Sequence, residues 1–280
     1  MWDDQTRRPR HELKQLLAGG DGFDMVEAAL WIAAEEYPDL DVDHTAARVR
    51  LISAEGARLA DGLGNPFARL DALRTHLFDD LGFRGNEKEY NDPRNSFVNE
   101  VLDRRLGNPL TLSILFIDVA RAAGFEAHGV GLPGHFVASV TYAGRTVLVD
   151  PYHCGQVICE DDCRQLVSKT TGRPSLFRRQ LLEGADERAM LTRMLLNLKY
   201  IYVKSEDYRR ALAAVERLLL VSPHDSTEIR DRGFLYAHLG HPGAAVSDLE
   251  SYLALVPSAR DAESVRGRVA WLRQRISECN

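Results

Sequence analysis

Cysteine is scarce in this chain, which argues against a secreted protein held together by disulfides. The 280 residues include four cysteines, and three of the four cluster between Cys154 and Cys163. Disulfide frameworks of secreted domains instead use an even set of cysteines spread along a short chain. We therefore expect the thiols to be reduced.

Long apolar runs are also missing. No stretch approaches the roughly 20 consecutive apolar residues that a transmembrane helix needs. The N-terminal stretch MWDDQTRRPRHELKQ has no apolar segment of the signal-peptide type. The sequence therefore predicts a cytoplasmic protein with no membrane partner.

Neither sign of charge is concentrated in one region. The formal net charge is -6, and basic residues are interspersed with acidic ones instead of forming a stripe, so nucleic-acid binding is not expected. A phosphate-binding loop is missing too, because the segment 62–66 (GLGNP) lies between two predicted helices and lacks the lysine of such loops. No cofactor is expected.

The apolar residues that are present predict a helical N-terminal part. They make up 45% of the chain, which is enough to bury a full core and to form two compact units. They recur at helical spacing over residues 23–83, with breaks at Tyr37-Pro38 and at 62–66. This pattern predicts a bundle of three helices within residues 1–90. The polar segment 82–95 is expected to form a long loop.

Residues 91–185 are predicted to form an α+β core around one buried helix. Asn108 is a favourable N-cap and Pro109 a favourable first helical residue, so a helix is expected to begin there. The residues 110–123 (LTLSILFIDVARAA) are apolar on nearly every side, which predicts a central position for this helix. Gly124 ends it.

Beyond the central helix, the apolar period changes from helical to alternating. Residues 125–130, 135–142 and 145–150 are predicted as three short strands, the last two joined by a hairpin turn at Ala143-Gly144. A buried helix that leads into a small antiparallel sheet is an α+β arrangement.

An internal repeat marks residues 186–280. The pairs that a shift of 34 positions superposes include Tyr202 with Tyr236, Ala211 with Ala245 and Pro223 with Pro257. This is the tetratricopeptide period, in which small residues let paired helices approach closely. The sequence therefore predicts two repeats and a last helix over residues 262–276, and it indicates a protein or peptide partner.

Four motifs in the core resemble those of a known family. They are 95–103 (NSFVNEVLD), 105–109 (RLGNP), 131–136 (GLPGHF) and 149–152 (VDPY). Together with the repeats, they resemble the bacterial transglutaminase-like proteins with a C-terminal tetratricopeptide segment, the SirB-type family. The resemblance implies a core related to the papain-like fold.

The resemblance also implies where a site lies. Enzymes of the wider transglutaminase and papain-like group use a cysteine at the start of a buried helix, a histidine and an aspartate. His135 opens one predicted strand and Asp150 ends the next, so they are the candidate catalytic pair. Pro109 stands where the cysteine is expected, so the nucleophile is absent. The other candidates for a pocket are Asn108, Thr111, Pro133, Gly134 and Tyr152.

Structural alternatives to this site stay open. His135 and Asp150 can also form a hydrogen bond that only holds the sheet edge. The glycines and proline of 131–134 can shape a cleft wall or form only a tight turn, and the sequence favours the turn.

A metal site is the weaker alternative for the segment after Asp150. Its candidate zinc ligands are His153, Cys154, Cys159 and Cys163. The spacing does not give two separated chelating pairs, and adjacent residues rarely bind one tetrahedral ion. No metal is therefore the favoured expectation.

The missing nucleophile favours a non-catalytic binding or scaffold protein whose repeats bind a partner. The alternative is an amide hydrolase or acyl transferase that uses His135 and Asp150, with Thr111, Ser113 or Cys154 as the nucleophile. A third possibility is a repeat adaptor in which the central domain is a spacer.

Overall fold

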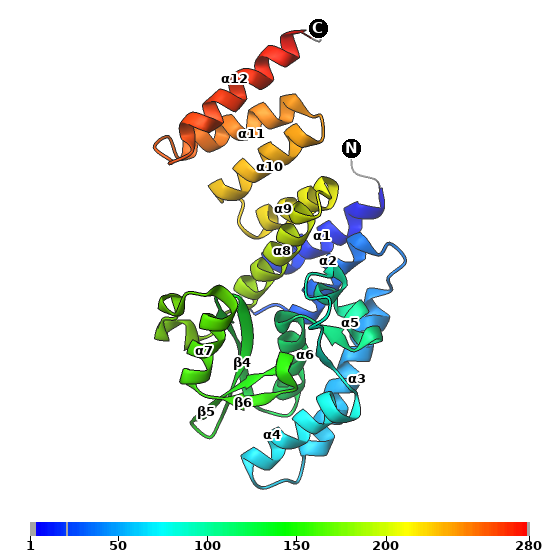
Figure 1. Cartoon of the computed structure of the whole chain (residues 1–280). Coiled ribbons are helices and arrows are strands. Elements are labelled where there is room, and N and C mark those ends of the chain that lie inside the picture. Colours follow the sequence, from blue (N-terminus) through cyan, green and yellow to red (C-terminus); the bar gives the residue numbers. More distant parts are fainter. Residues whose placement is uncertain (1–3, 21, 279–280) are drawn as a thin grey trace. The chain divides into compact units, whose positions relative to one another are not determined.

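The computed structural model describes residues 4–20 and 22–278 and contains two compact units, Met1–Met194 and Leu195–Asn280 (Figure 1). The division lies inside helix α8 (Glu187–Lys204). The predicted boundary between the α+β core and the repeat segment follows residue 185, just before this helix begins. Within the described part of the chain, no helix combines the length and the apolar composition of a membrane span.

Helices form the N-terminal part of the first unit. They are α1 (Asp4–Ala18), α2 (Met25–Glu36), α3 (Val42–Ala60), α4 (Pro66–Arg74) and the π-helical turn η1 (Thr75–Asp80) that continues α4. Helices α2 to α4 are the three predicted over residues 23–83. The sequence pattern does not reveal α1, because most residues of this helix are polar; among its described side chains, Leu13 and Leu17 are buried apolar ones at helical spacing.

Helix α6 (Pro109–Ala122) lies at the centre of the first unit, as predicted. The Asn108 side chain caps it, because Oδ1 accepts a hydrogen bond from the Thr111 amide at 2.9 Å. Residues 110–117 of the helix are buried. It packs against strands β3 (Glu126–Leu132) and β4 (His135–Tyr142) and against helices α2, α3 and α5 (Val98–Arg104). Burial of the apolar side chains of this helix stabilises the core.

The sheet of the first unit is antiparallel, in the order β3 (Glu126–Leu132), β4 (His135–Tyr142), β5 (Arg145–Asp150) and β6 (Gln156–Ile158). The predicted turn joins β4 to β5, where Ala143 and Gly144 have φ angles of 50° and 76°. These left-handed values suit a two-residue type I′ turn. Strand β6 was missed, because three residues are too few for an alternating pattern. The predicted α+β architecture is confirmed.

The segment 82–95 is only partly the loop that the sequence predicts. Its strand β1 (Arg84–Gly85) pairs in parallel with β2 (Leu106–Gly107), and a Cβ on Gly85 would lie 2.5 Å from the ring of Tyr152. A two-residue strand leaves no periodic signal, which is why β1 was not predicted.

The remaining elements of the first unit are η2 (Pro93–Ser96), η3 (Pro151–His153), α7 (Glu160–Thr171), η4 (Pro174–Leu176) and η5 (Arg179–Glu183).

The second unit is helical. After the C-terminal half of α8 follow α9 (Tyr208–Val221), α10 (Ser226–His238), α11 (Pro242–Leu255) and α12 (Ala262–Glu278). The repeat positions Ala211 and Ala245 are fully buried. Helix α12, predicted over residues 262–276, packs against α11 through Val265 and Val269. The paired helices that the repeat predicts are therefore present.

Candidate active-site remnant in the first unit

His135 is the first residue of β4 and follows a tight turn. Leu132 pairs with His135 across the β3–β4 hairpin, so Pro133 and Gly134 form a two-residue turn. Gly134 has a φ angle of 77°, and a Cβ there would lie 2.6 Å from Oγ1 of Thr170. Both the backbone conformation and the space therefore require glycine. Of the two alternatives for residues 131–134, a cleft wall or a tight turn, the structure contains the turn.

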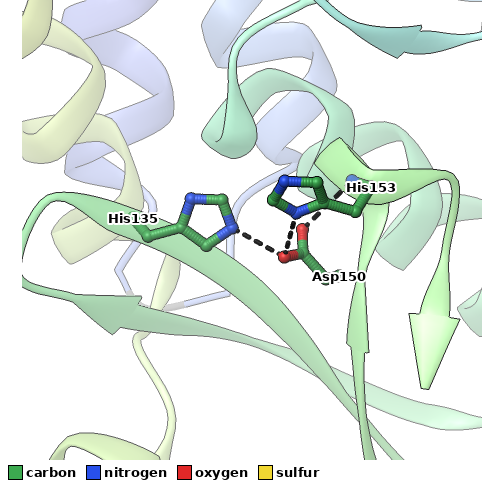
Figure 2. A group of neighbouring side chains, drawn as sticks. All are labelled: His135, Asp150 and His153. Carbon is green, nitrogen blue, oxygen red and sulfur yellow. Dashed lines mark hydrogen bonds and ion pairs between the residues drawn. The ribbon is translucent and has the colours of Figure 1, made fainter. Parts of the chain in front are cut away.

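Asp150 ends β5 at the end of the sheet where β4 begins. Its Oδ1 accepts hydrogen bonds from the backbone amides of Tyr152 and His153, at 3.1 and 3.4 Å. Its Oδ2 accepts a hydrogen bond from Nε2 of His135 at 2.8 Å. The structure thus brings together the two residues of the predicted pair, His135 and Asp150 (Figure 2).

A third side chain, His153, binds the same carboxylate oxygen. Its Nδ1 lies 2.7 Å from Oδ2 of Asp150, and Figure 2 shows both imidazoles directed at this carboxylate. In the sequence, His153 is a candidate only as a zinc ligand. The signal that could have found it is its spacing, because Pro151 starts a 3₁₀ turn in which residues three apart share one side.

The cluster is buried at one end and open at the other. His135 is 4% and Asp150 1% exposed, whereas 36% of the His153 side chain is accessible. Burial acts to raise the pKa of Asp150, but the hydrogen bonds and charges of His135 and His153 outweigh it and hold this pKa well below its usual range. The hydrogen bond to Asp150 raises the pKa of His153, against the effect of burial. The carboxylate is therefore ionised at neutral pH.

The hydroxyls at the start of α6 are bonded within the helix. Oγ1 of Thr111 donates to Oδ1 of Asn108 at 3.1 Å, and Oγ of Ser113 donates to the Pro109 carbonyl at 2.7 Å. Both hydroxyl residues are fully buried. In the described part of the chain, the hydrogen bond of His135 goes to Asp150 and not to either hydroxyl. Neither of these two predicted nucleophiles is therefore hydrogen-bonded to the imidazole of His135.

Tyr152, another predicted pocket residue, packs edge-on against His135 with ring centroids 5.8 Å apart. It makes the same edge-on contact with His153, at 5.2 Å, and with Tyr90, at 6.1 Å. Burial raises the pKa of Tyr152 to about 12, so its phenol is neutral at physiological pH. Tyr152 thus forms an uncharged wall beside the His135 ring.

A cavity of about 510 Å³ adjoins the cluster. Asp150 and His153 form part of its wall, and Asp162, Gln165 and Lys169 line the side formed by α7. The predicted pocket residues Asn108, Thr111, Pro133, Gly134 and Tyr152 do not line this cavity. The cluster is therefore reached from the side of α7, through the accessible imidazole.

The structure does not assemble the alternative set of zinc ligands. Cys163 is buried in the apolar core, where burial raises the pKa of its thiol to about 12, and Cys154 and Cys159 are exposed. Among the described residues, the group whose ligand atoms lie within 4.8 Å of one another is His135, Asp150 and His153. Of the alternative set, only His153 belongs to that group.

An apolar groove of about 450 Å³ lies in the second unit, lined by α8, α10 and the start of α9. Its apolar and aromatic side chains are Leu196, Tyr200, Val203, Tyr208, Phe234 and Leu235. The ammonium of Lys199 lies 2.8 Å from Glu228 and 2.6 Å from Asp231, so these carboxylates balance its charge. The groove is therefore predominantly apolar.

Known proteins resemble the chain across both units. The profile of the transglutaminase-like superfamily matches residues 40–196, and a tetratricopeptide-repeat profile matches residues 198–270. A UPF0162 protein of Xylella fastidiosa is 34% identical over 259 residues, which cover 88% of each chain. A UPF0162 protein of Pseudomonas aeruginosa is 30% identical, covering 91% of this chain and 90% of that protein. Protein SirB1 of Salmonella typhimurium is 23% identical, with 72% and 75% covered.

Proposed function

The chain belongs to the transglutaminase-like superfamily, and we propose that it is a non-catalytic member of it that acts as a binding or scaffold protein. Its core supplies a histidine, an aspartate and an adjoining cavity, but no nucleophile at the start of the central helix. Its helical repeats supply a groove that suits a segment of a partner protein.

The start of helix α6 is the observation that carries the proposal. Papain-type catalysis uses a thiolate at this position, where the helix N-terminus and a nearby imidazolium stabilise the negative charge. Here the first helical residue is Pro109, and the hydroxyls of Thr111 and Ser113 already donate hydrogen bonds within the helix. A hydroxyl without a base beside it is a far weaker nucleophile than a thiolate.

Covalent labelling of the full chain tests for a catalytic nucleophile. We expect a thiol-directed probe to label exposed cysteines equally in the wild type, in His135→Ala and in the control His128→Ala, because an exposed thiol reacts without help from an imidazole. We expect no labelling by an acyl-donor probe. Labelling of a single site that His135→Ala abolishes and His128→Ala leaves intact would contradict the proposal.

An amide hydrolase or acyl transferase is the second candidate, because His135 and Asp150 form the kind of pair that activates a nucleophile. Cys154 is the thiol to test, since it is exposed and directly follows His153. Acyl-donor labelling that disappears in Cys154→Ser would favour this enzyme. If neither the wild type nor Cys154→Ser is labelled, the result favours the proposal of a non-catalytic binding protein.

The groove of the second unit supports a partner with apolar side chains. Tyr200 is 60% exposed, although its ring lies among the other apolar residues of the groove. Exposed aromatic side chains of this kind often contribute most to a binding interface, because they bury large areas at little cost in conformational entropy. An extended or helical peptide with apolar anchors therefore fits the groove better than a charged ligand does.

Affinity capture with the full chain as bait tests this role of the groove. Proteins captured from the native cell extract are quantified for the wild type, for Tyr200→Ala and for the control Leu255→Ala. Leu255 is exposed but does not line the groove. We expect a defined set of proteins to be lost in Tyr200→Ala and kept in the control. Equal capture by all three baits would contradict binding in the groove.

A further inference from the structure

Two imidazoles and one carboxylate converge on a single point in the first unit. Nε2 of His135 and Nδ1 of His153 face the same atom, Oδ2 of Asp150, at 2.8 and 2.7 Å. The three ligand atoms lie within 4.8 Å of one another. From this geometry we propose that His135, Asp150 and His153 bind a divalent transition-metal ion, with zinc as the ion to test first.

The donor atoms match what zinc accepts. Two imidazole nitrogens and one carboxylate oxygen are common ligands of zinc and of neighbouring first-row ions. With ligand distances of about 2.0–2.1 Å, the donor atoms of a tetrahedral site lie about 3.3 Å apart. The two contacts to Oδ2 need to lengthen by about half an ångström to admit the ion, and each ring nitrogen releases to solvent the proton that it shares with Asp150. Of the three ligands, His153 has the most accessible side chain, at 36%, so its movement displaces the least packing.

Hydrogen bonds to the carboxylate already orient it as a ligand. The amides of Tyr152 and His153 hold Oδ1, which leaves Oδ2 facing the two imidazoles. The amide of Gly155 donates to the Asp150 carbonyl at 2.9 Å and closes the turn that carries His153. Such supporting hydrogen bonds fix the direction of a ligand and lower the cost of binding the metal.

The surroundings allow an ion to enter and to complete its coordination. The cavity of about 510 Å³ borders Asp150 and His153, so solvent reaches the cluster on that side. Three protein ligands leave one tetrahedral position for water, which the cavity can supply. His135 and Asp150 are buried, and a low dielectric around them strengthens their attraction to a cation. The site is thus built by the first unit alone.

Metal titration of the chelator-treated full chain tests the proposal. Calorimetry with ZnCl₂ should show one ion per chain with a Kd below about 10 µM. CoCl₂ should give visible absorption bands, and these bands should disappear when added zinc displaces the cobalt. His153→Ala and Asp150→Asn should each weaken zinc binding at least about tenfold. Because His153 is partly exposed, its alanine variant should keep the wild-type circular dichroism spectrum.

Two controls separate this site from other zinc ligands. His128→Ala removes a half-exposed imidazole from the same sheet, and the double variant Cys154→Ser/Cys159→Ser removes the exposed thiols. Both should bind zinc as the wild type does. The proposal is overturned if no stoichiometric binding occurs, if His153→Ala binds zinc normally, or if the loss of the thiols abolishes binding. None of these results depends on whether the chain is catalytic.

Discussion

Asp150 is the single residue on which the order of the cluster most depends. Its carboxylate accepts hydrogen bonds from two imidazoles and two backbone amides while it is 1% exposed. Asp150→Asn keeps the size of the side chain but removes the charge between the imidazoles. We expect it to lower the free energy of unfolding by about 2–4 kcal/mol, measured by urea unfolding at neutral pH with a chelator present.

A matched carboxylate makes this prediction specific. The Asp161 side chain is 83% exposed, so Asp161→Asn should change the unfolding free energy by less than about 0.5 kcal/mol. Equal effects of the two substitutions would mean that the buried hydrogen bonds of Asp150 add nothing to stability.

Asp118 is a partly buried carboxyl of α6 whose charge opposes folding. Burial raises its pKa, and a hydrogen bond from Ser53 only partly offsets this. Because the pKa of the folded state is above that of the unfolded state, the folded state binds the proton more tightly. The stability that this group contributes is therefore full at acid pH and is lost as the pH rises through the folded pKa.

Substitution of Asp118 tests the sign of this effect. Asp118→Asn should remove the decline and raise the unfolding free energy at about pH 8 by up to about 1 kcal/mol. At about pH 5 the gain should be smaller. Urea unfolding of the wild type and of Asp118→Asn at the two pH values measures this gain. A gain at about pH 8 that is no larger than the gain at about pH 5, or a loss at about pH 8, would contradict a raised pKa of Asp118.

Residue-scale features differ in how well the sequence predicts them. His135 and Asp150 stand in recognisable motifs at the ends of alternating segments, so the sequence was sufficient to single them out. The contact of His153 depends on a short 3₁₀ turn, whose one sequence signal is the spacing of three residues from Asp150. The hydrogen bonds of Thr111 and Ser113 depend on side-chain rotation, which a sequence pattern does not encode.

Among the elements, α6 depends on a buried N-cap. Asn108 accepts a hydrogen bond from the Thr111 amide and donates one to Oγ of Ser96 at 2.9 Å. Asn108→Ala removes the cap and leaves buried groups unpaired, so it should cost at least about 2 kcal/mol of unfolding free energy. The exposed cap Asn65→Ala on α4 should cost no more than about 1 kcal/mol. Similar losses in urea unfolding would show that burial of the cap is irrelevant.

Helices α10 and α11 depend on the absence of a side chain at Gly233. A Cβ there would lie 2.8 Å from Cγ of the buried Leu249. Gly233→Ala should therefore destabilise the protein by about 1–3 kcal/mol through overpacking. Gly267 in α12 has open space, so Gly267→Ala should stabilise by up to about 1 kcal/mol. Thermal unfolding should show a lower Tm for Gly233→Ala and a higher Tm for Gly267→Ala. Two shifts of the same sign would contradict the packing argument.

Element length decides what the sequence predicts at this scale. The long helices and strands β3 to β5 carry enough apolar residues to show a period. The misses were α1 and α7, whose buried stripes are narrow, and the strands β1, β2 and β6, which are two or three residues long. Pairing of such short strands is imposed by the surrounding tertiary structure.

For the whole molecule, motifs and repeat period were enough to predict the family. The superfamily and repeat matches, together with the UPF0162 and SirB1 relatives, confirm the predicted resemblance. The ranges 1–90, 91–185 and 186–280 and the roles of the site residues stay predictions. Function was harder to predict than fold, because it depends on a nucleophile, a metal ion or a partner, none of which leaves a periodic pattern.

The turn closed by Asp150 has a consequence for local opening of the protein. The amides of Tyr152 and His153 donate to its side chain, and that of Gly155 donates to its carbonyl. Exchange of these amide hydrogens with deuterated solvent requires the turn to separate from the first residue of β4. The three amides should therefore exchange through one cooperative opening and share the same free energy of protection.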